Sequence, residues 1–242
     1  MGSKRYTNDS HFSNALQSHL LPSETTSSDM DKYSTNTELD EFREALKTSA
    51  PAYRVELSPD VTRGLCDYYQ LLVAWNPRLH LVAPCSAQLF AQRHVLESLM
   101  ALPYLKKSAQ IADIGSGAGL PIIPCLIARP DLTALLIESS QKKTVFLREA
   151  LREARKADSA RVIPMRFEDV PTPQVDAVSC RALDRFEDKL STIVDWAPRR
   201  STLLFFGSER MRELINGLSL VFEEMKIPFS EKRFLFVIDR RE

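Results

Sequence analysis

A cluster of glycines directly after a short apolar run sets the strongest limit on how this chain can fold. Three of the seven glycines, Gly115, Gly117 and Gly119, fall within five residues and follow the apolar stretch 109–112 and Asp113. Glycine reaches backbone conformations that other residues avoid, and it lets a ligand approach the main chain closely. A glycine cluster at the end of a strand therefore predicts a strand-to-helix turn that cradles a nucleotide-like molecule.

Composition is that of a globular protein with one full core. Of the 242 residues, 44% are hydrophobic and 26% are charged, and the formal net charge is zero. No stretch reaches the roughly 18 apolar residues of a membrane helix, and the N-terminus lacks the apolar segment of a secretory signal. The four cysteines show no paired spacing, which argues against a zinc site. We therefore expect a cytoplasmic protein without a metal, and a monomer.

Hydrophobic patterns divide the chain into three parts. Residues 1–50 are rich in Ser, Thr, Asn and acidic residues, and we expect most of them to form a flexible polar extension. Residues 51–107 predict an N-terminal helical cap. Residues 108–242 alternate strands with helices, which is typical of an α/β fold with a doubly wound, mostly parallel sheet.

Within the first two parts, helical spacing of apolar residues predicts three helices. A short helix is expected around 38–47. A longer one begins with Ser58 as its N-cap and stops at Asn76–Pro77, and a third runs from 86 to 102.

The third part predicts a closing antiparallel pair after its parallel strands. The final strand, 233–238, is expected to pair with one near 227–230. Helices are expected to begin near Leu120, at Gln141, near Asp184 and near Glu209. The other expected strands are 110–114, 134–138, 161–165, 176–180 and 203–206.

The spacing of the glycines favours a methyl donor over a dinucleotide. A dinucleotide fingerprint would place its third glycine at position 120, where this chain has Leu120. Glu138 ends the next expected strand, about 20 residues after the cluster, where a carboxylate can accept hydrogen bonds from both ribose hydroxyls of a nucleoside. A GxGxG loop after a strand that ends in the acidic Asp113 resembles the usual first motif of S-adenosylmethionine methyltransferases.

Two other sets of residues are candidates for a site. Lys142 and Lys143 open the helix that follows Glu138, where acidic residues are usual, so they indicate either an anionic neighbour such as phosphate or a solvated charge run. Arg181 ends a parallel strand, where it can hold a carboxylate or phosphate in the binding crevice, or form a surface ion pair.

Several motifs together resemble the GidB/RsmG family, over roughly residues 55 to 240. That family methylates N7 of a guanine in 16S ribosomal RNA with S-adenosylmethionine, which implies this activity, a class I methyltransferase fold and a ribosomal RNA or small-subunit particle as partner. The motifs that carry the resemblance are Asn76–Leu81, Arg93–Ser98, Asp113–Pro124, Glu138 with Lys142–Lys143, Arg166–Asp169 and Ser179–Ala182.

The resemblance implies roles for individual residues. Gly115 and Leu120 line the methionine side of the cofactor, Glu138 takes its ribose, and Phe167 with Glu168 frames its adenine. Arg181 stands at the cofactor's mouth. The resemblance also marks Arg93 and His94 on the cap, where they face either the sheet or the RNA.

One departure from the family opens an alternative function. The family's Lys-Gly on the fifth strand is Phe206–Gly207 here, which removes an expected RNA or active-site contact. A module that binds S-adenosylmethionine or ribosomal RNA but methylates weakly is therefore the first alternative, and a nicotinamide-dependent oxidoreductase is the second. Since guanine N7 carries a free lone pair, methylation there requires no base, and we expect catalysis by positioning without an identified catalytic residue.

Overall fold

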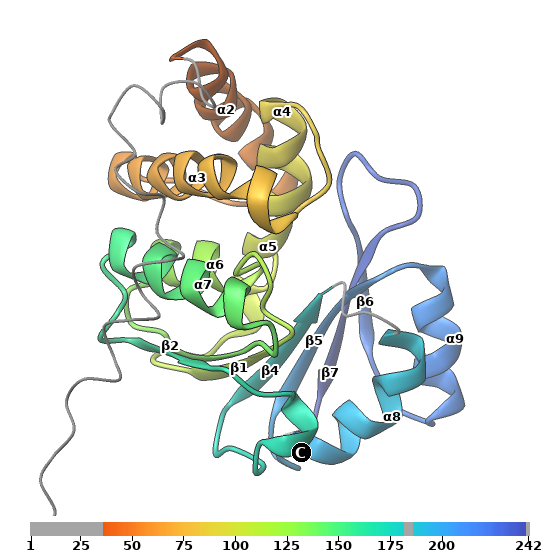
Figure 1. Cartoon of the computed structure of the whole chain (residues 1–242). Coiled ribbons are helices and arrows are strands. Elements are labelled where there is room, and N and C mark those ends of the chain that lie inside the picture. The colour runs from red at the N-terminus through yellow and green to blue at the C-terminus, as the bar shows by residue number, and fades with distance from the viewer. Residues whose placement is uncertain (1–35, 182–185, 241–242) are drawn as a thin grey trace, which may run out of the picture.

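The computed structural model describes residues 36–181 and 186–240, and a mixed sheet forms their centre (Figure 1). Within these residues the sheet has seven strands in the order β3-β2-β1-β4-β5-β7-β6, and the first five run parallel. The strands are β1 (Gln110–Ile114), β2 (Thr133–Ile137), β3 (Ala160–Ile163), β4 (Ala177–Arg181), β5 (Thr202–Gly207), β6 (Glu223–Lys226) and β7 (Phe234–Asp239). The predicted doubly wound α/β fold is confirmed.

Helices cover both faces of this sheet, which explains why its central strands are apolar on both sides. One face carries α6 (Ile122–Ala128) and α7 (Gln141–Glu153), and the other carries α8 (Phe186–Trp196) and α9 (Glu209–Gly217) (Figure 1). Three of these helices begin close to where the sequence predicts. The fourth predicted start, Asp184, lies outside the described residues.

The chain order of the strands reverses between β1 and β4, so the helices that follow these two strands lie on opposite faces. At such a switch point the loops diverge and leave a crevice at the carboxyl ends of the strands. Here those ends carry Asp113, the glycine cluster and Arg181.

The cap consists of short helices joined to one long helix, α3 (Pro59–Leu79). Ser58 is the predicted N-cap, and its hydroxyl accepts a hydrogen bond from the Val61 amide at 3.2 Å. The helix passes Pro77 and ends at His80, whose φ of 48° is left-handed, so the predicted stop at Asn76–Pro77 is early by less than one turn. The other cap elements are α2 (Asn36–Ser49), η1 (Ala50–Tyr53), α4 (Ala87–Phe90), η2 (Ala91–Leu96), α5 (Glu97–Leu99) and η3 (Leu102–Tyr104).

The third cap helix departs from regular α-helical geometry in its middle. Ser86 caps its first turn through the Leu89 amide at 3.2 Å, but residues 91–96 form a π-helical segment, η2. π-Helical turns are rare, and they are frequently found at functional sites. Here the segment carries both Arg93 and His94.

Helix α2 belongs to the cap, so the ordered cap begins before residue 51. Phe42 and Leu46 are fully buried, and the Phe42 ring stacks on Tyr69 of α3 with centroids 4.3 Å apart. The apolar face from which the sequence predicts a helix around 38–47 explains this packing. It places α2 in the cap and not in the polar extension expected for residues 1–50. Residues 1–35 lie outside the described residues.

The cap and the sheet share one hydrophobic core. Trp75 of α3 meets Phe146 of α7 edge to face with centroids 5.9 Å apart, and buried cap residues pack in one cluster with residues of α6 and α7. Among the described helices, none is long and apolar enough to cross a membrane.

The closing antiparallel pair exists, but its first strand lies earlier than predicted. β7 pairs with both β5 and β6, and β6 spans Glu223–Lys226 instead of 227–230. Residues 227–230 cannot extend that strand, because Phe229 has a left-handed φ of 55°. They form a hairpin tip that reaches the cap, where the Tyr53 hydroxyl donates to the carbonyl of Pro228 at 3.3 Å.

Candidate functional site

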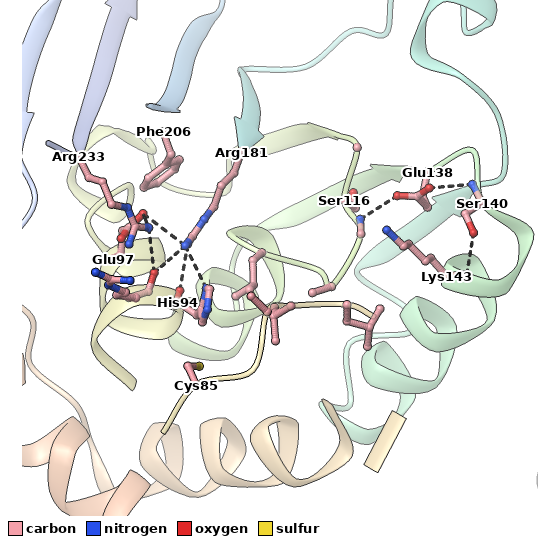
Figure 2. A pocket seen from close by; sticks show the side chains of 18 of the residues that line it. Cys85, His94, Glu97, Ser116, Glu138, Ser140, Lys143, Arg181, Phe206 and Arg233 are labelled. Carbon is pink, nitrogen blue, oxygen red and sulfur yellow. Dashed lines mark hydrogen bonds and ion pairs between the residues drawn. The ribbon is translucent and has the colours of Figure 1, made fainter. Parts of the chain in front are cut away.

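A cavity of about 920 Å³ lies at the carboxyl ends of β1, β2, β4 and β5, under the cap. Its volume is in the usual range for a small-molecule site. Figure 2 shows its walls: Glu138, Ser140 and Lys143 lie on one side, and His94, Glu97, Arg181 and Arg233 on the other. The glycine loop and the cap loop 81–85 also line it.

The three loop positions require glycine for different structural reasons. All have positive φ, at 68° for Gly115, 52° for Gly117 and 82° for Gly119. A Cβ on Gly117 would meet only the Gly115 carbonyl, at 3.6 Å, so this position faces open space in the cavity wall. A Cβ on Gly119 would lie 2.3 Å from Cδ1 of Ile123, so the third glycine permits close packing of α6 against the loop.

The cap supports this loop directly. The hydroxyl of Tyr68, a fully buried residue of α3, donates to the Ala118 carbonyl at 2.7 Å. Burial raises the pKa of this phenol well above its usual value, so it is a neutral donor. This hydrogen bond therefore ties α3 to the glycine loop.

Glu138 fixes the opposite edge of the loop. Its Oε2 accepts from the Gly117 amide at 2.9 Å, and its Oε1 accepts from the Ser140 amide at 2.7 Å. A carboxylate offers about four lone-pair sites. Two sites therefore remain for hydroxyl donors, which fits a ribose with two adjacent hydroxyls.

Asp113 lies beneath the loop as a buried acid. Its Oδ1 accepts from the Ser179 hydroxyl at 2.6 Å, whereas its Oδ2 has no hydrogen-bond partner within the described part of the chain. Burial raises the pKa of Asp113 to about 7, and the Ser179 hydrogen bond opposes the rise. The loop therefore rests on a group that changes charge near neutrality.

Arg181 crosses from the sheet to the cap. Its guanidinium donates to the carbonyls of Arg93 at 2.6 Å and His94 at 3.3 Å, and to the Ser98 hydroxyl at 3.3 Å. It also lies 5.7 Å from the centroid of the Phe206 ring. The side chain lines the cavity as expected, and its ion pair is with the buried Glu97 and not at the surface. The predicted hold on a carboxylate or phosphate ligand in the crevice stays a prediction.

Glu97 and Arg233 complete this wall, and sequence reasoning missed both. Glu97 Oε1 accepts a short hydrogen bond from Nη2 of Arg233 and lies 3.4 Å from Nη2 of Arg181. Burial raises the pKa of Glu97, and the two guanidinium groups oppose that rise. The acidic residue stands inside the Arg93–Ser98 motif, which was the available signal. No sequence signal marks Arg233, because its place beside Glu97 results from the pairing of β7 with β5 in the folded chain.

His94 is held in its neutral form. Its Nδ1 lies 3.2 Å from Nη2 of Arg181, and its ring packs against Phe90 with centroids 4.9 Å apart. Burial first, and the neighbouring Arg181 second, lower the pKa of His94 to about 3. A cap-to-core contact, one of the two predicted roles, is therefore present.

The cavity gathers eight of the twelve predicted site residues. Gly119 lies behind its wall, and Phe167 is buried edge to face against Trp196 with centroids 5.8 Å apart. Glu168 forms an ion pair with Lys189 at 2.9 Å outside the lining. Lys142 is exposed and also lies outside it, whereas the eight that line the cavity are Arg93, His94, Gly115, Gly117, Leu120, Glu138, Lys143 and Arg181.

The cap loop 81–85 is a further part of the lining that sequence reasoning did not assign. Asn76 shapes it, since its Oδ1 accepts from the Val82 amide at 3.0 Å and its Nδ2 donates to the Val82 carbonyl at 3.1 Å. The motif Asn76–Leu81 marks this region in the sequence, but it does not predict that the loop lines the cavity.

Comparison with known proteins gives consistent matches. The family model described as rRNA small subunit methyltransferase G (GidB) matches residues 62–217. Ribosomal RNA small subunit methyltransferase G of Neisseria gonorrhoeae (strain NCCP11945) is 34% identical over 151 residues, which are 62% of this chain and 72% of that protein. The protein of the same name from Xanthomonas campestris pv. campestris (strain B100) is 43% identical over 129 residues, which are 53% of this chain and 60% of that one.

Solved structures agree on the fold. An RNA methyltransferase from Salinibacter ruber in complex with S-adenosyl-L-homocysteine has a TM-score of 0.50 at 15% identity and covers 61% of this chain and 90% of its own. A ribosomal protein L11 methylase from Lactobacillus delbrueckii subsp. bulgaricus has a TM-score of 0.51 at 11% identity, with 62% and 79% covered. The family model spans more than half of the sequence, and the chain therefore belongs to the rRNA small subunit methyltransferase G (GidB) family.

Proposed function

We propose that this protein transfers a methyl group from S-adenosylmethionine to N7 of a guanine in 16S ribosomal RNA. Family membership makes the chain a methyltransferase, so the oxidoreductase alternative is set aside. The observation that carries the proposal is the hydrogen bond from the Gly117 amide to Glu138 on one wall of the cavity. The opposite wall bears arginines.

The geometry supports part of the proposed cofactor contacts, and the family resemblance supplies the rest. Glu138 accepts the ribose hydroxyls, and the backbone at Gly115 and Gly117 lets the nucleoside lie against the main chain. Leu120 lines the methionine side, and the adenine role of Phe167 with Glu168, which lie outside the cavity lining, rests on the family resemblance alone. When bound, S-adenosylmethionine supplies an electrophilic methyl group on its sulfonium.

No proton transfer is required of the protein before methylation. Guanine N7 has a free lone pair, so the chain's task is to orient the base and exclude water, which can contribute several orders of magnitude in rate. The wall formed by Arg181, Glu97 and Arg233 is fixed by hydrogen bonds before any substrate arrives. Preorganisation of this kind reduces the entropy lost on binding.

Cations at the rim are suited to the RNA backbone. The Arg93 side chain is exposed at the cavity mouth, and no ion pair involves it within the described residues. Lys143 lines the opposite side, and Lys142 is exposed beside it. We assign these three to phosphate contacts, which position the RNA without reading its sequence.

Methyl transfer can be tested with labelled S-adenosylmethionine and 16S RNA, as free RNA and as small-subunit particles, from cells that lack this protein. We expect label in at least one substrate. Glu138→Gln should weaken S-adenosylhomocysteine binding about 10- to 100-fold, the range for hydrogen bonds to a charged group. Glu149→Gln, on the helix that follows, is the matched control. Unchanged affinity in Glu138→Gln would remove the cofactor assignment.

Phe206 favours one second candidate, a binding module. Its ring is 5% exposed and packs beside Arg181, where the resemblance implies a lysine. If neither free RNA nor particles accept label while S-adenosylhomocysteine still binds, the module replaces the enzyme as the conclusion.

A further inference from the structure

Glu97 contains a buried carboxylate oxygen that nothing in the described chain satisfies. The residue is 1% exposed and lines the cavity, and both arginines approach its Oε1. Its Oε2 is buried and has no hydrogen-bond partner in the described residues. A buried acceptor without a donor costs free energy, so it requires an explanation.

We propose that Glu97 Oε2 accepts hydrogen bonds from the target base and makes the site selective for guanine. This inference rests on the proposed function. An ionised carboxylate only accepts hydrogen bonds, so its partner must present donors. Of the four RNA bases, guanine alone carries two adjacent donors, N1–H and the N2 amino group, on one edge. Adenine and cytosine place a lone pair beside their amino group, and uracil has one donor between two acceptors.

The two walls of the cavity can face opposite edges of a guanine. N7 lies on the opposite side of the purine from N1 and the N2 amino group. Figure 2 shows Glu97 with Arg181 and Arg233 on one side of the cavity and Glu138 on the other. A base that directs its N1 edge to Glu97 therefore turns its N7 edge toward the wall that carries Glu138 and the glycine loop.

The two arginines prepare the carboxylate for this role. Arg181 from β4 and Arg233 at the start of β7 hold Oε1 from two separate strands, which fixes the plane of the group. Their positive charges favour its ionised form. In that form it repels the N1 lone pair of adenine and the N3 lone pair of cytosine, so selection includes an unfavourable term for the wrong base.

Nucleotide binding tests the inference without depending on methyl transfer. Dissociation constants of guanosine 5′-monophosphate and adenosine 5′-monophosphate are measured on the full chain saturated with S-adenosylhomocysteine, which blocks the cofactor's own adenine position. We expect the wild type to favour the guanine nucleotide by about 10-fold or more, the value of a hydrogen bond to a charged group. In Glu97→Gln the ratio should fall to near one, because an amide can also donate to adenine N1.

Glu149→Gln is the matched control, since it makes the same carboxylate-to-amide change on α7, outside the cavity lining. It should keep both the guanine preference and the affinities of the wild type. A wild type without the preference, or a Glu97→Gln variant that retains it, would overturn the inference. So would a loss of S-adenosylhomocysteine affinity in Glu97→Gln with the ratio unchanged, since the carboxylate would then serve the cofactor's ammonium. A failure to methylate 16S RNA refutes the proposed function alone.

Discussion

Alanine substitutions at three glycines should separate packing from ligand access in this fold. Gly119→Ala places a Cβ 2.3 Å from Cδ1 and 2.8 Å from Cγ1 of Ile123. Ile123 is fully buried, so its side chain must shift within a packed core. Gly117→Ala meets only a carbonyl oxygen at 3.6 Å, and its methyl group points to open space at the cavity.

The magnitudes follow from these contacts. A left-handed conformation costs an L-residue about 1–2 kcal/mol, and both substitutions incur this cost. Overpacking in a filled core adds about 1–3 kcal/mol, and only Gly119→Ala incurs it. We therefore expect the free energy of unfolding to fall by about 2–5 kcal/mol for Gly119→Ala and by about 1–2 kcal/mol for Gly117→Ala. Gly217→Ala is the control, because its Cβ meets nothing within 4 Å.

Urea unfolding gives the stabilities, and calorimetric titration gives the affinity for S-adenosylhomocysteine. Gly117→Ala should lose cofactor affinity out of proportion to its small loss of stability, whereas Gly217→Ala should change neither by much. Equal destabilisation by Gly117→Ala and Gly119→Ala would refute the division between a packing glycine and a site glycine. So would unchanged cofactor affinity in Gly117→Ala.

Three other substitutions test the buried groups. His94 has a pKa lowered from 6.5 to about 3, so the unfolded chain binds the extra proton and stability falls as pH drops below about 6.5. His94→Gln should remove this part of the dependence, at most about 1.4 kcal/mol per pH unit, in denaturant unfolding at pH 5 to 8. Asp113 has a pKa raised to about 7, so its contribution falls as pH rises from about 4 to 7, and Asp113→Asn should gain stability on the wild type at pH 8 but not at pH 4. Phe206→Leu should lower the melting temperature, since it removes a cation–π contact with Arg181 worth about 0.5–2 kcal/mol.

The wall formed by the glycine loop and Glu138 was predictable because its residues lie on local elements. An apolar run that ends at Asp113 and meets three glycines describes β1 and its turn without reference to distant residues. Glu138 follows the next strand in the same way. The hairpin was misplaced because β6 reads as polar, with Glu223, Glu224 and Lys226 exposed at the edge of the sheet. An edge strand needs no apolar face, so periodicity cannot find it.

The base-facing wall was not predictable, because it exists only after distant segments meet. The carboxylate of Glu97 in α5 meets two guanidinium groups, those of Arg181 in β4 and of Arg233 at the start of β7. The π-helical segment then turns the carbonyls of Arg93 and His94 toward Arg181. This wall joins the cap to the sheet, and the α3 phenol of Tyr68 joins the cap to the glycine loop, so the cap is bonded to both walls of the cavity. Substitutions in the cap interior should therefore lower the rate of methylation more than they lower cofactor affinity.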